Sequence, residues 1–225
     1  TVTDELSGVK ILHAAGLFNL GKSINLSREQ RKAYIQLVRS KKLDGYKVVF
    51  GSIEQIKKYR ELYGYKFVDL DQETDNGFID MKSKIIHLIN PSVETLVHEM
   101  IHAATYGSVL NYYRDPSLNS KEVNEAIERI EGLMGEFLKL SPKELARLTP
   151  DQRAAISNVK AAIQEPGNNF DNAPDVALAK SLNEFMAWSL SNQELISAFK
   201  NVKLPTALQI AKEVIAIIKK FFTFK

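Results

Sequence analysis

Apolar residues recur at helical spacing over most of the second half of the chain. Within residues 93–104 they fall at i, i+3, i+4, i+7, i+8 and i+11, which forms one stripe along a helix. The stripe comprises Val93, Leu96, Val97, Met100, Ile101 and Ala104. Asn90 and Pro91 precede it as a cap and a first helical residue. Further helices are expected over residues 121–140, 175–190 and 206–222, and after the capping residues Ser141 and Thr149.

The first half of the chain predicts shorter elements of both kinds. Residues 46–50 form a β-rich run, and Ser52 with Gln55 opens a capped helix that ends at Gly64. An earlier helix is expected from Ser27, capped with Gln30, to about Lys42, and a short helix within residues 1–26. Three further strands, separated by turn residues, are expected at residues 65–70, 77–81 and 84–89.

These elements predict an α+β fold in three parts. Residues 1–45 are expected to form an N-terminal helical segment, and residues 46–110 an α/β lobe that ends in the helix after Asn90. Residues 111–225 are expected to form a helical lobe.

Three polar residues lie off the apolar stripe of residues 93–104. They are His98, Glu99 and His102, in the spacing H-E-x-x-H. On a helix, two histidines four positions apart lie on one face, where they can bind one metal ion. The glutamate between them is free to act as a base, so this spacing indicates a zinc site with Glu99 as the catalytic group.

A catalytic zinc site needs a third protein ligand and leaves a fourth position for water. No histidine follows His102, so the third ligand is expected to be His13, His87 or a carboxylate. Glu184 is the favoured carboxylate, because the apolar residues around it would make its charge costly to bury without a cation. His87 lies in a predicted strand and is expected to be an ordinary hydrogen-bonded histidine.

Composition narrows the choice of partner. The chain has 30 basic and 27 acidic residues and a net charge of +3, which is too close to balance to indicate nucleic acid or a membrane. Neither a basic–aromatic stripe nor an apolar run long enough to span a bilayer is present in the sequence. A peptide or protein substrate is therefore expected, with no nucleic-acid partner and no membrane partner.

The absence of cysteine excludes disulfides and thiolate ligands, so a metal ion would be bound by His, Asp or Glu. It also favours an intracellular or virion-associated location over a secreted one. The chain begins Thr-Val-Thr without Met and ends Phe-Phe-Thr-Phe-Lys after an apolar run, so we expect it to be part of a longer polypeptide.

Two stretches together resemble a known family. They are V-H-E-M-I-H-A-A-T, from Val97, and N-E-F-M-A-W-S-L-S-N, from Asn183. They are similar to zincin metallopeptidases of the gluzincin type, and more narrowly to the zincin-like peptidase domains of phage polyvalent and virion-associated proteins. The resemblance implies His98 and His102 as ligands, Glu99 as base and Glu184 as third ligand.

The fold that this resemblance implies is zincin-like. A small twisted N-terminal sheet with helices would lie above the H-E-x-x-H helix, and an all-helical C-terminal lobe would carry the third ligand. Residues 84–89 would form the edge strand that pairs with an extended peptide. One departure stands out, because thermolysin-like members place an acid shortly after the glutamate ligand, where this chain has Ala187-Trp188-Ser189.

The function expected from this resemblance is zinc-dependent hydrolysis of a peptide bond, in which Glu99 takes a proton from a metal-activated water. Two alternatives remain open. One is a catalytically weak or inactive zincin-fold module with a structural or interaction role in a larger phage protein. The other is a toxin or effector that cleaves one host protein.

Overall fold

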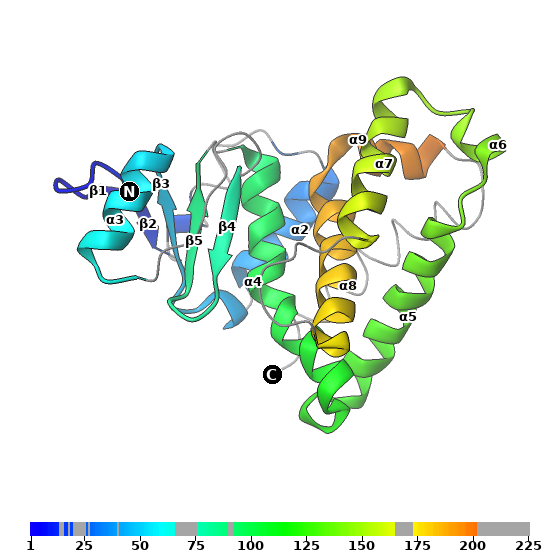
Figure 1. Cartoon of the computed structure of the whole chain (residues 1–225), viewed down its shortest axis with the longest axis horizontal. Coiled ribbons are helices and arrows are strands. Elements are labelled where there is room, and N and C mark those ends of the chain that lie inside the picture. Colours follow the sequence, from blue (N-terminus) through cyan, green and yellow to red (C-terminus); the bar gives the residue numbers. More distant parts are fainter. Residues whose placement is uncertain are drawn as a thin grey trace. The chain divides into compact units, whose positions relative to one another are not determined.

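The computed structural model describes residues 1–13, 16–17, 19, 26, 28–39, 41–65, 76–89, 92–164 and 173–201. The chain divides into two compact units, Thr1–Ala103 and Ala104–Lys225. Helices and strands are both present, so the fold is α+β, as predicted (Figure 1). No helix in the described ranges combines the length and the apolar composition needed to cross a lipid bilayer.

A five-stranded sheet forms the centre of the first unit, in the order β1-β2-β3-β5-β4. Strand β3 pairs in parallel with β5, and every other pairing is antiparallel. A parallel pair requires a crossover connection, and helix α3 (Ile53–Leu62) lies in this one. The strands are β1 (Val2–Thr3), β2 (Lys10–His13), β3 (Lys47–Phe50), β4 (Gly77–Asp80) and β5 (Ile85–Leu88).

Helix α3 has the boundaries that its sequence predicts. The Ser52 side chain accepts a hydrogen bond from the Gln55 backbone, and the Gln55 side chain accepts one from the Ser52 backbone. Gly64, just after the helix, has a φ of +66°, a conformation that glycine adopts without a steric penalty. The helix buries Ile53, Ile56 and Tyr59 in a core that also includes residues of the sheet, namely Val49 and Ile85.

Two predictions for this unit are wrong. The helical segment expected over residues 1–45 is wrong for residues 2–3 and 10–13, which are strands, because strands this short show no readable alternation of polar and apolar residues; residues 28–39 are helical as expected. The strand at residues 84–89 is not an edge, since β5 lies between β3 and β4. Its parallel partner is distant in sequence, so local patterns do not reveal it.

Helix α2 (Arg28–Arg39) buries Tyr34 and Leu37, and a short 3-10 turn follows at Lys41–Leu43. The predicted cap at Ser27 and the predicted strand at residues 66–70 lie outside the described residues.

Helix α4 (Val93–Arg114) carries the predicted apolar stripe. The stripe residues Leu96, Val97, Met100 and Ile101 are buried, and Ala104 is buried as well. The Ser92 hydroxyl accepts a hydrogen bond of 2.9 Å from the backbone N–H of Thr95 and so caps the first turn. The predicted start signal at residues 90–91 lies outside the described residues.

The second unit is helical in its described ranges. Its capping boxes at Ser141 and Thr149 form as predicted. Phe137 lies at the centre, with its ring centroid 5.4 Å from that of Phe185 and 5.8 Å from that of Phe199. The predicted helix at residues 206–222 lies outside the described residues. The helices after α4 are η2 (Pro116–Leu118), α5 (Lys121–Leu138), α6 (Pro142–Leu145), α7 (Pro150–Gln164), α8 (Pro174–Ser191) and α9 (Gln193–Asn201).

Candidate metal centre

Helix α4 presents two histidines that face one another. The Nε2 atoms of His98 and His102 are 2.9 Å apart, and the ring centroids are 4.6 Å apart with the planes at 75°. This convergence of two imidazole nitrogens follows directly from the four-residue spacing on a helix. Glu99, between them in sequence, is buried, with 7% of its surface exposed.

Glu184 lies on helix α8, next to a buried hydrogen bond. The side-chain amide of Asn183 donates to the Thr105 hydroxyl over 2.6 Å, and both residues are almost fully buried. Asn183 directly precedes Glu184, and Thr105 follows His102 by less than one turn of helix α4. This hydrogen bond therefore joins α8 to the part of α4 that follows His102.

His98, His102 and Glu184 each offer one ligand atom, and these atoms all lie within 4.8 Å of one another. Zinc binds imidazole nitrogen and carboxylate oxygen at about 2.0–2.2 Å, so ligand atoms around one ion lie roughly 3–4 Å apart. The donor set of two histidines and one glutamate is one that zinc uses in catalytic sites.

The other two histidines lie elsewhere in the fold. His13 is an exposed residue of β2. His87, in β5, has no exposed surface, and its Nε2 lies 3.2 Å from Nη1 of the buried Arg60. A guanidinium group only donates hydrogen bonds, so Nε2 of His87 must accept and its proton must lie on Nδ1.

A short network holds Arg60 in place. Its Nη2 is 3.1 Å from Oδ2 of Asp80, and the Phe78 ring stacks on His87 with centroids 4.2 Å apart. Burial and the positive charge of Arg60 lower the pKa of His87 to about 3, so this ring is neutral. No local pattern indicates the Arg60–Asp80 pair, because the two residues share no motif and come together only through the sheet.

Comparison with known proteins gives one informative similarity. No family model matches the chain, and no solved structure matches it. Over 220 residues, which are 95% of the chain, it is 33% identical to the virion DNA-directed RNA polymerase of Enterobacteria phage N4.

This similarity corrects several expectations. The assignment to zincin metallopeptidases is wrong, and so are the peptidase function and the inactive zincin module offered as its alternative. The expectation of a peptide substrate and no nucleic acid is overturned by a relative whose name specifies DNA. H-E-x-x-H fixes the spacing of two donors on a helix, and it does not by itself fix the family.

The phage origin expected from the sequence agrees with this relative, which is a virion protein and an enzyme by its name. The chain spans only 6% of the length of that relative.

Proposed function

We propose that this chain is a segment of a virion-borne DNA-directed RNA polymerase polypeptide, and that it contributes a zinc centre to that polypeptide. The similarity to the phage N4 protein supports the first part, because it extends over 95% of the chain at 33% identity. A match of this extent concerns the whole segment and not a short motif.

The zinc centre is proposed to consist of His98, His102 and Glu184. The observation that carries this proposal is the convergence of their three ligand atoms within 4.8 Å. Two of the ligands share one helical face, and the third is placed beside the buried Asn183–Thr105 hydrogen bond. All three residues lie on helices, and sites built on helices hold their ligands more precisely than sites built on loops.

A zinc ion held by such a trio would supply Lewis-acid chemistry and would lower the pKa of a bound water toward neutrality. Glu99 would be the group beside the ligands that could accept a proton. Glu99 is adjacent to His98 in the chain and is buried, so it lies beside the proposed ligands and away from bulk solvent.

Metal analysis tests the zinc centre. Protein purified without added zinc should contain about one zinc ion per chain, since two histidines and one carboxylate make one site. His102→Ala and Glu184→Gln should each lose the ion. Glu99→Gln should keep the ion, because Glu99 is not a ligand. His13→Ala is the matched control and should also keep it, because His13 is an exposed histidine of β2. Equal zinc in wild type, His102→Ala and Glu184→Gln would refute the centre.

Assignment to the polymerase polypeptide needs a separate experiment. The parent polypeptide, isolated from virions, should synthesise RNA on a DNA template. An antibody raised against residues 121–164 should recognise that same polypeptide. Detection of the segment only on a polypeptide without RNA synthesis would refute the assignment and leave the metal analysis untouched.

A further inference from the structure

Charge is segregated within the second unit. Helix α5 carries five acidic and two basic residues, which gives a net charge of −3. The next stretch, residues 139–160, carries five basic and two acidic residues, which gives a net charge of +3. The near-neutral balance of the whole chain therefore conceals two opposed regions. The five cations, called here the basic surface, are Lys139, Lys143, Arg147, Arg153 and Lys160.

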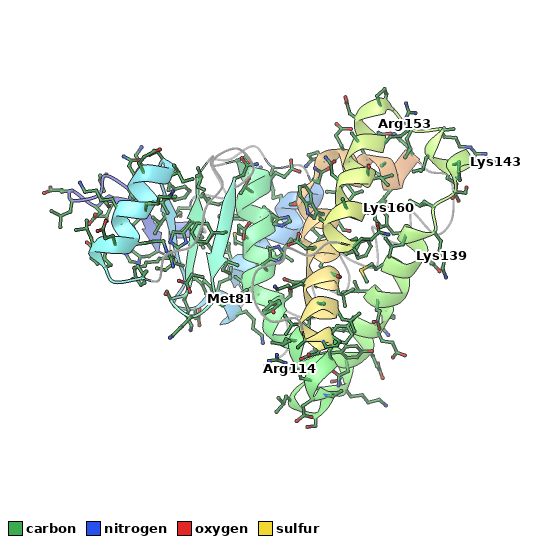
Figure 2. The ribbon with its side chains drawn as sticks, viewed as in Figure 1. Met81, Arg114, Lys139, Lys143, Arg153 and Lys160 are labelled. Carbon is green, nitrogen blue, oxygen red and sulfur yellow. The ribbon has the colours of Figure 1, made fainter. Side chains whose placement is uncertain are left out.

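The basic surface lies where helices α5, α6 and α7 follow one another. Figure 2 shows Lys139, Lys143, Lys160 and Arg153 distributed around the end of α5, the short α6 and α7. All of the five cations except Lys160 are exposed. Within the described ranges of the chain, none of the five forms an ion pair.

Two of these cations are held in place by backbone carbonyl groups. Nη1 of Arg153 donates to the carbonyl of Leu148 over 2.6 Å. Nζ of Lys160 donates to the carbonyl of Leu138 over 3.0 Å and lies 5.8 Å from the centroid of the Phe137 ring. A carbonyl group binds a cation without neutralising its charge, so these contacts orient the positive charges and leave them available to an anion.

One of the two acids in this stretch is already engaged. An oxygen of the Glu144 carboxylate accepts a hydrogen bond of 2.5 Å from the backbone N–H of Ser141, as part of the capping box of α6. The hydrogen bonds from Ser141, together with Arg147 and Lys160, lower the pKa of Glu144. Its charge is thus committed to the helix start, and the surrounding surface remains positive.

The character of this surface favours nucleic acid over a lipid membrane. Among the described residues, the large apolar side chains that are exposed lie outside residues 139–160. A membrane-binding surface needs such side chains to enter the bilayer, whereas phosphate groups of nucleic acid need only cations at the surface. The acidic helix α5 would repel a polyanion and so confine it to the basic surface.

We propose that the basic surface binds the phosphate backbone of nucleic acid. This inference draws on the proposed polymerase polypeptide for the kind of partner. It shares no residue with the zinc centre, so the two can fail independently.

Binding of a fluorescent 20-nucleotide DNA, single-stranded and duplex, to the 225-residue chain tests the proposal. The measurement is made by anisotropy in the presence of EDTA, which separates it from the zinc centre. The four exposed cations of the basic surface would make four phosphate contacts. Four contacts predict that the affinity for the duplex falls on the order of 100-fold between 50 and 200 mM salt. The quadruple variant K139E/K143E/R147E/R153E should bind at least about 10-fold more weakly and show a shallower salt dependence.

The matched control changes net charge by the same amount elsewhere. It is K58E/K82E/K121E/R129E, which reverses four exposed cations outside the basic surface. This control should bind within about threefold of wild type, because these residues contact no phosphate in the proposal. Circular dichroism reports folding, and K139Q/K143Q/R147Q/R153Q gives a second test if charge reversal disturbs the fold.

Three results would overturn the proposal. The first is undetectable binding of both DNA probes by the wild-type chain. The second is an equal loss in the variant and the control, which would indicate a net-charge effect only. The third is tighter binding to vesicles of phosphatidylserine and phosphatidylcholine than to DNA, which would indicate a lipid surface instead.

Discussion

His87 and the pair His98 and His102 show how differently the same side chain can be used in this protein. The ring of His87 is fully buried in the sheet, and its Nε2 lone pair faces the guanidinium of Arg60. His98 and His102 turn their Nε2 atoms toward each other, and a carboxylate oxygen of Glu184 lies within reach. Nε2 of His87 faces a hydrogen-bond donor, whereas the ligand atoms of His98, His102 and Glu184 lie within 4.8 Å of one another, a set that suits a cation.

The difference lies in the neighbours and not in the histidine itself. A guanidinium beside an imidazole disfavours both protonation and metal binding, because either would bring two positive charges together. A carboxylate beside two imidazoles instead adds a third donor that a cation can bind. Four predictions follow in order of decreasing expected effect; the first three test this contrast, and the fourth tests the packing of the sheet beside His87.

The largest effect is expected from Arg60→Met. It removes the buried partner of Asp80 and His87 and should lower the free energy of unfolding by about 3–5 kcal/mol, measured by urea denaturation. Arg114→Met removes a partly exposed partner of Asp175 and should lower the free energy of unfolding far less, because exposed ion pairs contribute little to stability. Similar losses in the two variants would show that the Arg60 network does not act as a buried ion pair.

Acidic pH should lower the free energy of unfolding of the first unit, because His87 is buried as a neutral ring. The unfolded ring binds a proton below its ordinary pKa of 6.5, whereas the folded ring stays neutral down to a pKa of about 3. The contribution of neutral His87 to the free energy of unfolding is therefore fully present above pH 6.5. It falls by about 3 kcal/mol between pH 6.5 and pH 4. The measurement is denaturant unfolding as a function of pH.

His87→Gln supplies the control for this acid effect. Glutamine keeps an acceptor for Arg60 and does not titrate, so the pH dependence over this range should largely disappear. Asp80 stays in place, and hydrogen bonds from Ser83 and Arg60 outweigh its burial and lower its pKa, so its protonation falls mostly below this range. An unchanged pH profile in His87→Gln would exclude His87 as the source.

Asn183→Leu should weaken zinc binding by about 10–100-fold, since outer residues that orient ligands contribute about this much to affinity. The substitution removes the hydrogen bond that joins α8 to Thr105 of α4 one residue before Glu184. Titration against a competing chelator measures the affinity. Thr105→Val should have a similar effect, and the double variant should lose little more than either single one. His87→Gln should leave the affinity unchanged, and an equal loss there would contradict the contrast.

The smallest effect is expected from Gly77→Ala, which disturbs a contact shared by the sheet and helix α4. A Cβ at Gly77 would lie 2.8 Å from Cγ2 of Thr95 and 2.9 Å from the His87 carbonyl oxygen. Thermal unfolding should show a loss of about 1–2 kcal/mol. Thr95→Ser removes the nearer atom and should recover part of the loss. Gly107→Ala, with nothing within 4 Å, should be neutral or stabilising.

The elements that sequence predicted well carry local signals. The capping boxes at Ser52, Ser141 and Thr149 form because both partners lie within three residues of each other. The apolar residues of the α4 stripe recur with the period of a helix, so they fall on one face of α4, and that face is buried. The three residues His98, His102 and Glu184 come together in the structure, and their role as zinc ligands remains a proposal.

What the sequence did not predict depends on distant parts of the chain. Strand β2 is defined by its pairing with β3, since Lys10 lies opposite Phe50 and His13 opposite Lys47. The buried position of Arg60 depends on Asp80 and His87, which reach it through the sheet. The expectation of no nucleic-acid partner rested on a charge averaged over the whole chain, and averaging removed the opposed charges of α5 and residues 139–160.

The parallel ladder between β3 and β5 sets the order in which the first unit can be completed during synthesis. Strand β4 can pair with β5 as soon as the turn at residues 81–84 has been made, and β2 can pair with β3 much earlier. Joining these two pieces must wait until β5 has left the ribosome, because β3 has no other parallel partner among the described strands. Until then, one side of β3 stays open, and a nascent chain is most vulnerable to mispairing there.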